Sequence, residues 1–431
     1  MEKLTTGISV LVAASRSGQR LEAGGGGILY SASDANRGHL GHDGYFSPIM
    51  EPILEYYKRY PYKAVNLSYP LSYYHSSEVR GGAILLNRRA IAIIMTELIE
   101  RIALGKNLAA QRKSNRRFLL LRNLLFNLKP NLIFAFQATQ ELCKAAHDLG
   151  IAVVEPMHGM NLSPEDKIFK STIFGITSEA LPDAYLAYDD RTYATLSELI
   201  GNREITVFRM PHPWHVECQR TDSILFDAKR ASSLFSSAKP IKILVSLQWG
   251  YDGERDSLSN IIPNGIVHPS IEQAIVENQD VLWLLRMHPV QVKARGYKAH
   301  RDYVQSLSGK HPNVEWQDAT ELPLPVLLAN VQGHITMSSG AAGEAAIFGV
   351  PSLLLCPTLK PGRAHSGWFT ELADAGLAEF GELESECITN WISRLPKIQP
   401  EAQHKNCESE HRKFAAVLDR VLQVYKNRLQ E

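Results

Sequence analysis

The tripeptide Ser338-Ser339-Gly340 lies between a predicted strand, Gln332 to Met337, and a predicted helix, Ala341 to Phe348. Backbone N–H groups of small residues just before a helix N-terminus can face an anion, because the helix dipole favours negative charge there. Glu344 follows one turn into the helix, where a carboxylate suits bidentate binding of ribose hydroxyls. The spacing therefore predicts a nucleotide site with the phosphates at the loop. A solvated helix glutamate after an ordinary strand-to-helix turn is the alternative.

Two further apolar runs in this half of the chain end in residues that suit a phosphate. Val281–Met287 carries Arg286 near its end and is followed by His288, and both side chains can form charge-assisted hydrogen bonds with a diphosphate. Ile241–Leu247 is followed by Gly250, which allows close approach of a phosphate. A complete G-x-G-x-x-G is absent, which counts against a nicotinamide or flavin dehydrogenase.

Titratable side chains also follow predicted strands in the first half of the chain. Asp34 and Asp43 come after the apolar run Ile28–Ser31, and Glu155 and His158 come after a later one. Because ligands bind at the carboxyl ends of parallel strands, Asp34, Asp43 and His158 are the candidates for a general base. Asp34 is our first choice, since it is closest to a strand end, and His158 is the second. An ordinary surface loop and a structural histidine are the alternatives.

The elements that must position these side chains alternate between strands and helices. Leu132–Phe136, Thr139–Leu149 and Ile151–Val154 read as one right-handed β-α-β unit, which indicates an α/β fold with parallel sheets. The 431 residues favour two domains. We predict a first domain at 1–225, a Ser/Ala-rich linker at 226–240, a second domain at 241–400, and a final helix at 401–431 that packs back on the first domain. An oligomerisation helix is the alternative for the last segment.

The composition restricts the compartment and the partners. Lys and Arg number 46 against 45 Asp and Glu, so the net charge of +1 does not favour nucleic acid. The five cysteines form no C-x-x-C pair, which indicates a reducing compartment and no structural zinc. We therefore expect a cytoplasmic protein without metal or cofactor. The basic run 111–117 is the local exception, as an exposed helix start or as a peripheral contact with an anionic membrane or a lipid-linked pyrophosphate.

The stretch that starts at Val331 resembles the nucleotide-sugar half of GT-B glycosyltransferases. Its small-residue turn, Glu344-Ala345 pair, Gly349-x-Pro351 and apolar strand occur in the order of that family. The resemblance covers mainly residues 240–385, with weaker matches at 28–60 and 130–215. The resemblance implies two Rossmann-like, doubly wound parallel-sheet domains that face each other across a cleft. It also places Glu344 on the donor ribose and Gln317 in the turn that reads the base. His288-Pro289 together with Ser338-Ser339 is similar to the paired motifs of bacterial sialyl-, polysialyl- and Kdo-transferases.

The resemblance implies a transferase of capsular polysaccharide or lipopolysaccharide synthesis. It would move a sugar from a CMP- or UDP-activated donor to a glycan or lipid-linked acceptor, inverting or retaining. Arg286 and His288 would stabilise the charge on the leaving phosphate. The donor site would consist of Gly250, Arg286, His288, Gln317, Ser338, Ser339, Gly340 and Glu344. Two alternatives remain open, a UDP-GlcNAc 2-epimerase of the same architecture and a non-catalytic scaffold of polysaccharide assembly.

Overall fold

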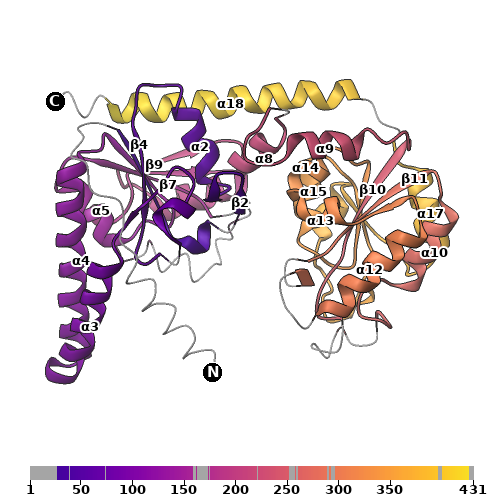
Figure 1. Ribbon diagram of the computed structural model, residues 1–431, viewed down its shortest axis with the longest axis horizontal. Helices are drawn as coiled ribbons and strands as arrows, with labels where there is room; N and C mark the ends of the chain where they lie inside the picture. The colour runs from indigo at the N-terminus through magenta and orange to yellow at the C-terminus, as the bar shows by residue number, and fades with distance from the viewer. Residues whose placement is uncertain are drawn as a thin grey trace. The chain divides into compact units, whose positions relative to one another are not determined.

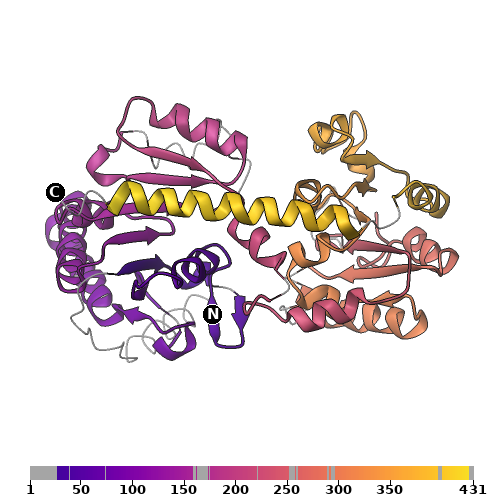
Figure 2. The same cartoon turned by 90° about the horizontal axis from the view of Figure 1, so that it is seen from above.

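The chain forms two compact α/β units in the computed structural model. The first unit is Met1–Glu217 with Glu408–Glu431, and the second is Cys218–Cys407. Each has a parallel sheet with helices packed against it (Figures 1 and 2). The structure describes residues 27–37, 39–72, 74–158, 162, 173, 175–220, 222–251, 258, 261–288, 291–292, 297–396 and 400–426, the side chains of 400–407 and 426 excepted. The predicted α/β class with two Rossmann-like parallel sheets is confirmed.

Seven parallel strands form the sheet of the first unit, in the order β5-β4-β1-β6-β7-β8-β9. They are β1 (Ile28–Ala32), β4 (Ala64–Ser68), β5 (Ile84–Leu85), β6 (Leu132–Ala135), β7 (Ala152–Pro156), β8 (Ala184–Ala187) and β9 (Thr206–Arg209). Successive side chains of a strand point to opposite faces of the sheet. Tyr30 of β1 therefore joins a core with α2 (Met50–Tyr57), while Leu29 joins a second core with α4 (Lys106–Leu128) and α5 (Gln140–His147).

The last helix, α18 (Pro400–Lys426), contributes to the core of the first unit. Phe414, Leu418 and Tyr425 are buried on one side of it, at the spacing of one helix face. The Tyr57 hydroxyl donates to the Leu418 carbonyl at 2.8 Å, and the Tyr425 hydroxyl donates to the Asp183 carbonyl at 3.0 Å. The segment 408–426 therefore folds as part of the first unit although it is distant in sequence.

Six parallel strands form the sheet of the second unit, in the order β12-β11-β10-β13-β14-β15. They are β10 (Ile241–Ser246), β11 (Val281–Arg286), β12 (Val314–Glu315), β13 (Gly333–Thr336), β14 (Ser352–Leu354) and β15 (Ala378–Phe380). Numbered within the unit, this is the doubly wound order 3-2-1-4-5-6. The strand order reverses between β10 and β13, and ligands of such sheets bind outside the carboxyl ends of the strands at that point.

The remaining elements connect and cover these sheets. They are the hairpin β2 (His39–Gly41) and β3 (Gly44–Phe46), and the helices α3 (Asn87–Leu104), α7 (Asp190–Ile200), α8 (Pro213–Cys218), α9 (Ala228–Phe235), α10 (Pro269–Glu277), α12 (Lys298–Lys310), α13 (Gln317–Glu321), α14 (Leu324–Leu328), α15 (Ala341–Ile347), α16 (Thr370–Asp374) and α17 (Ser385–Ser393). Among the described residues, no helix is both long enough and apolar enough to span a bilayer.

Several predicted boundaries differ from the structure. Apolar residues at helical spacing predict a helix over Ala83–Leu104. That helix begins only at Asn87, because Ile84–Leu85 pair with β4 as an edge strand. The same spacing predicts a second helix over Ser114–Leu128. In the structure it begins at Lys106, directly after Gly105, whose φ of 82° ends α3. The segment 226–240, predicted as a linker, holds α9. The apolar run Ile8–Ala13 also predicts a strand, and it lies outside the described residues.

One buried histidine connects three strands of the second sheet. His334 of β13 is fully buried, and its ring nitrogens lie 2.9 Å from the hydroxyls of Ser352 on β14 and Ser246 on β10. Burial lowers the pKa of His334 to about 3. The imidazole is therefore neutral in the folded chain down to that pH and takes part in the packing between strands.

We expect acid to destabilise the second unit through His334. Below a pH of about 6.5 the unfolded chain binds a proton that the folded imidazole does not, so stability falls by about 1.4 kcal/mol per pH unit until the folded pKa is reached. Urea unfolding of the wild type and of His334→Gln measures this slope. The measurements run from about two pH units below the ordinary pKa of histidine up to neutral pH. Equal slopes for both proteins would contradict the buried neutral state of His334.

Candidate functional site

Three loops meet at the carboxyl edge of the second sheet, where the strand order reverses. Gln248, two residues after β10, accepts hydrogen bonds through Oε1 from the Ser338 N–H at 2.5 Å and from Thr336 Oγ1 at 3.3 Å. The Gln291 amide donates to the Gln248 carbonyl at 3.3 Å, and its Oε1 accepts from the His288 N–H at 3.0 Å. The loops after β10, β11 and β13 are thus tied together through one glutamine pair.

A chain of side chains leads from the Ser338 loop into the unit. The Tyr251 hydroxyl lies 3.2 Å from Ser338 Oγ and 3.3 Å from Cys356 Sγ. Thr358 Oγ1 lies 2.9 Å from that sulfur and 2.8 Å from His365 Nδ1. These contacts hold the Ser338 hydroxyl in place from below. Neither Tyr251 nor Cys356 was predicted, because the contacts join residues more than 80 positions apart.

Ser339 and Gly340 form the start of α15. Ser339 Oγ accepts from the Ala341 N–H at 3.2 Å, and Gly340 is exposed with open space where a Cβ would lie. The predicted small-residue turn therefore leaves room for a ligand above the Ser338 loop.

Arg286 and Glu344 are both half-buried, and the charge of each shifts the pKa of the other. Burial lowers the pKa of Arg286 to about 10, and the negative charge of Glu344 opposes part of this shift. Burial also raises the pKa of Glu344, while the charge of Arg286 lowers it. Arg286 Nη1 donates to the carbonyls of Ala319 at 2.7 Å and Leu322 at 2.6 Å, with Thr320 at 3.3 Å. One nitrogen of the guanidinium therefore caps the C-terminus of α13.

The other predicted donor residues lie at the same strand ends with different exposure. His288 is half-buried, its ring centroid lies 6.0 Å from that of Trp249, and burial lowers its pKa. Gly250 has a φ of 92°, a conformation that favours glycine. Gln317 is exposed and is the first residue of helix α13. The position predicted as a base-reading turn is therefore a helix start.

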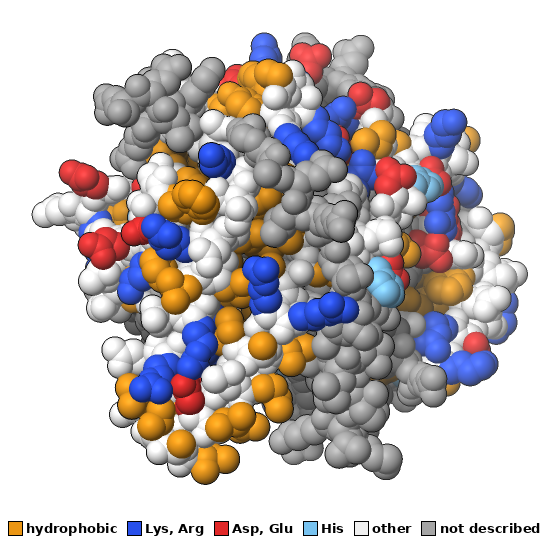
Figure 3. Space-filling view, turned by 60° about the vertical axis from the view of Figure 1, so that its left-hand side comes forward, with side chains coloured by type: hydrophobic (Ala, Val, Ile, Leu, Met, Phe, Trp, Pro, Cys, Tyr) orange, Lys and Arg blue, Asp and Glu red, His pale blue; other side chains and the backbone are white. Residues whose placement is uncertain are grey.

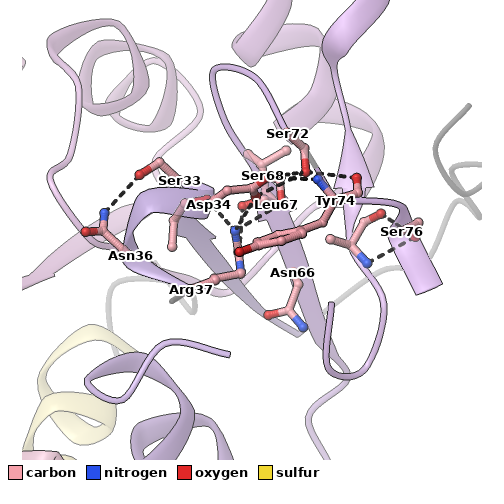
Figure 4. A network of polar contacts seen from close by, with 12 residues as sticks. Ser33, Asp34, Asn36, Arg37, Asn66, Leu67, Ser68, Ser72, Tyr74 and Ser76 are labelled. Carbon is pink, nitrogen blue, oxygen red and sulfur yellow. Dashed lines mark hydrogen bonds and ion pairs between the residues drawn. The ribbon is translucent and has the colours of Figure 1, made fainter. Parts of the chain in front are cut away.

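In the first unit, Asp34 is enclosed by the loop after β4 (Figure 4). Its side chain is buried, and its carboxylate accepts from Ser72 Oγ at 2.8 Å and from the Tyr74 N–H at 3.1 Å. Arg37 lies 3.8 Å from the carboxylate and donates to the Ala32 carbonyl at 2.6 Å and to Ser68 Oγ at 3.0 Å. This network connects the loops after β1 and β4, which is a structural use of both charges.

Asp43 and His158 lie on the surface of the first unit. Asp43, in the turn between β2 and β3, pairs with Arg80 at 3.0 Å, and its side chain is 69% exposed. Arg80 also pairs with Glu51 at 3.0 Å, and burial raises the pKa of Glu51 to about 7. His158 follows β7, is exposed, and stacks edge-on against Phe136 with ring centroids 5.4 Å apart.

A second group of polar side chains collects at the ends of β7, β8 and β9. Burial raises the pKa of Glu155 to about 8, although a hydrogen bond from the Ala138 N–H opposes the shift. Burial and the nearby Glu155 charge raise the pKa of the Tyr188 hydroxyl. The rings of Tyr188 and His212 lie 4.7 Å apart, and neither the Tyr188 hydroxyl nor His212 Nδ1 has a hydrogen-bond partner among the described residues.

Unpaired buried polar atoms are rare in folded chains, and each calls for a physical account such as a bound water, strain or a functional role. Sequence reasoning noted Glu155 without choosing it, and missed Tyr188 and His212. The segment after β9 carries two histidines three positions apart, His212 and His215, whose ring centroids lie 4.3 Å apart, and burial lowers the pKa of His215 to about 4. Among the side chains that the structure describes, no cluster of three or more His, Cys, Asp or Glu could hold a metal ion.

No protein-family model and no curated protein sequence matches the chain. Solved structures do match. UDP-GlcNAc 2-epimerase from Neisseria meningitidis, bound to UDP-GlcNAc, aligns with a TM-score of 0.50 at 13% identity over 92% of this chain and 98% of its own. A protein from Listeria monocytogenes that is provisionally named a UDP-N-acetylglucosamine 2-epimerase aligns with a TM-score of 0.49 at 12% identity. The alignment covers 93% of this chain and 96% of its own. The glycotransferase of kitacinnamycin aligns with a TM-score of 0.46 at 13% identity, over 95% of this chain and 100% of its own.

At these identities the likeness concerns the fold alone. The Neisseria structure supports an α/β fold, and the strand orders of this chain show two parallel Rossmann-like sheets independently of that comparison.

Proposed function

We propose that the chain is a glycosyltransferase that moves a sugar from a nucleotide-activated donor, charged with CMP or UDP, to a glycan or lipid-linked acceptor. One observation carries this proposal. The loops of Gln248, His288 and Ser338 are hydrogen-bonded together at the point where the doubly wound order of the second sheet reverses. Nucleotides bind at that point in such sheets, and the Arg286–Glu344 pair stands beside it.

In this proposal the donor nucleotide lies on the second unit. Glu344 accepts the ribose hydroxyls, and the phosphates meet Ser338, Ser339 and His288. Arg286 Nε and Nη2 have no hydrogen bond to any described residue, so they are available to a phosphate while Nη1 caps α13. Negative charge grows on the leaving phosphate during transfer, and donors placed at that atom stabilise the transition state more than the ground state.

The first unit supplies the proton transfer. Both Asp34 oxygens take part in hydrogen bonds to Ser72, so we now place Glu155 before Asp34, Asp43 and His158 as general base. A carboxyl with a pKa near the working pH can take a proton from an acceptor hydroxyl and return it to water. Tyr188 and His212 would orient the acceptor through their unpaired polar atoms.

A UDP-GlcNAc 2-epimerase is the second candidate. The observation that favours it is the same Glu155 with its raised pKa, since epimerisation requires a proton to leave a carbon and return. Incubation with UDP-GlcNAc and no acceptor separates the two functions. Formation of UDP with a free 2-epimeric hexosamine supports the epimerase, whereas transfer that requires a glycan or lipid-linked acceptor supports the transferase.

A thermal-shift panel of CMP, UDP, GDP and TDP tests the donor site. A nucleotide at 100 times its dissociation constant adds ~2.7 kcal/mol of apparent stability. We expect a response to CMP or UDP. A chain that responds to none of the four would be a scaffold that keeps the fold without the activity.

We expect Glu344→Ala to weaken binding of the responding nucleotide. Each lost charged hydrogen bond to a ribose hydroxyl costs roughly 1.5–3 kcal/mol, which is about 10- to 150-fold in affinity. Isothermal titration calorimetry measures the change. Glu386→Ala, an exposed glutamate in the first turn of α17, is the matched control. Unchanged affinity in Glu344→Ala would remove Glu344 from the ribose site.

A further inference from the structure

The helices α3 and α4 form a long hairpin at one side of the first unit (Figure 1). They contain 18 and 23 residues, so at 1.5 Å per residue they extend about 27 and 35 Å. Only Gly105 separates them. The base of α4 belongs to a core of the first unit through Leu121, Leu124 and Leu125, whereas α3 buries few residues.

The outer face of α3 is apolar and exposed. Met95, Leu98, Ile99 and Ile102 are 54%, 55%, 65% and 86% exposed, and Ile94 is 37% exposed. At 100° per residue these five side chains occupy an arc of about 140° on one face of the helix. A soluble helix normally turns such a stripe toward the core. We call these five residues the α3 stripe.

Ion pairs join α3 to α4, on a different side of α3 from the apolar stripe. Glu97 pairs with Arg101 at 2.7 Å and with Lys113 of α4 at 2.5 Å. Glu100 pairs with Arg112 at 3.4 Å and with Arg116, both of α4. The two helices are therefore joined by charged side chains here, and the α3 stripe stays outside this contact. This is the reverse of the usual amphipathic arrangement, and it presents the stripe to something outside the unit.

The hairpin is also strongly basic. Residues 87–128 contain nine Lys and Arg and two Glu, a net charge of +7. Because the whole chain has +1, the rest of it has −6. Arg88, Arg89, Lys106 and Arg117 form no ion pair with any residue that the structure describes. Figure 3 shows basic and hydrophobic side chains interleaved in the lower left part of the face it presents, with few acidic ones.

We infer that the α3–α4 hairpin binds the surface of an anionic lipid bilayer. The α3 stripe would lie among the acyl chains at the interface, and the basic residues would meet the anionic headgroups, as interfacial amphipathic helices do. Charge decides against a second copy of this chain, since two hairpins face to face would oppose +7 with +7. This inference does not depend on the proposed function, although a membrane position suits a lipid-linked acceptor.

Vesicle sedimentation with the full chain tests the inference. The probes are vesicles of neutral phosphatidylcholine and vesicles in which about a third of the lipid is anionic phosphatidylglycerol. We expect binding to the anionic vesicles, much weaker binding to the neutral ones, and loss of binding as salt is raised. Absence of binding to the anionic vesicles at low salt would overturn the inference.

Three variants separate the contributions, each first checked for an unchanged circular dichroism spectrum and melting curve. Met95→Ser with Leu98→Ser and Ile102→Ser removes the α3 stripe, and we expect at least a tenfold loss of partitioning. Arg88→Gln, Arg89→Gln, Lys106→Gln and Arg117→Gln together should lower it on the order of 10²–10³-fold, from about fivefold per charge. Ile224→Ser with Val276→Ser and Val424→Ser is the matched control, with exposures of 54%, 46% and 40% outside the hairpin, and should bind as the wild type does.

Two results would overturn the inference. The stripe variant could bind anionic vesicles as well as the wild type, in which case the stripe takes no part. Sedimentation equilibrium could instead show a wild-type dimer that the stripe variant converts to a monomer, which would assign the face to a second copy of the chain.

Discussion

Glu155→Gln is expected to lower turnover by roughly 10²–10⁴-fold, the usual contribution of a general acid or base, while nucleotide affinity stays unchanged. Glutamine keeps the shape of the side chain but cannot carry a proton between acceptor and water. The nucleotide contacts the second unit in our proposal, so its affinity should not respond. The measurement is release of nucleotide from the donor that gives the largest thermal shift, in the presence of acceptor, together with calorimetric affinity.

The pH dependence gives this prediction a second readout. If Glu155 acts as a base, activity rises with pH and levels off above a pKa of about 8, and the variant lacks that limb. The folded chain holds a proton on Glu155 that the unfolded chain releases above its ordinary pKa, so folding stability falls as pH rises toward about 8. Glutamine removes this loss, so the variant should be at least as stable as the wild type at pH 7, about one unit below the folded pKa.

Glu198→Gln, an exposed glutamate on α7, is the matched control and should keep full activity. Wild-type turnover in Glu155→Gln would place the base elsewhere, and Asp34, Asp43 and His158 would be the next residues to replace. Asp34→Asn would then need a stability measurement as well, since its carboxylate accepts hydrogen bonds from Ser72 and Tyr74.

Most strands of the two sheets were predictable from the sequence because parallel strands are short apolar runs bounded by polar or small residues. Ile241–Leu247 corresponds to β10 and Val281–Met287 to β11, within one residue at each end. The predicted start of α3 was wrong. Ala83 to Leu86 are all apolar, so they fit the spacing of a helix and that of a buried strand equally well. Only pairing with β4 decides that Ile84–Leu85 are a strand, and that pairing is a tertiary contact.

The side-chain partners in the candidate site were beyond sequence reasoning. Asp34 was our first choice as general base because it lies close to a strand end. In the structure its carboxylate accepts a hydrogen bond from Ser72, 38 positions later. His212 shares its His-Pro dipeptide with three other positions in the chain, so nothing local distinguished it. Its contact with Tyr188 and the unpaired Nδ1 appear only when β8 and β9 lie side by side.

Arg286→Met is expected to lower the unfolding free energy of the second unit by roughly 1.5–3 kcal/mol, the usual contribution of a hydrogen bond made by a charged group. The sequence predicted Arg286 as a phosphate ligand, whereas the structure has its Nη1 on three carbonyls at the end of α13, 33 to 36 positions later. Methionine fills the space but donates no hydrogen bond, and it leaves the half-buried Glu344 without its positive neighbour.

Tryptophan fluorescence during urea unfolding reports this change selectively, because five of the six tryptophans, all except Trp214, lie in residues 218–407. The double variant Arg286→Met with Glu344→Gln separates the two causes. Glutamine has no charge to leave unpaired, so the double variant should recover part of the lost stability, and the remainder belongs to the carbonyls of α13. A fall in nucleotide affinity with unchanged stability in Arg286→Met would show instead that the guanidinium acts on the phosphate alone and that the α13 cap contributes nothing measurable.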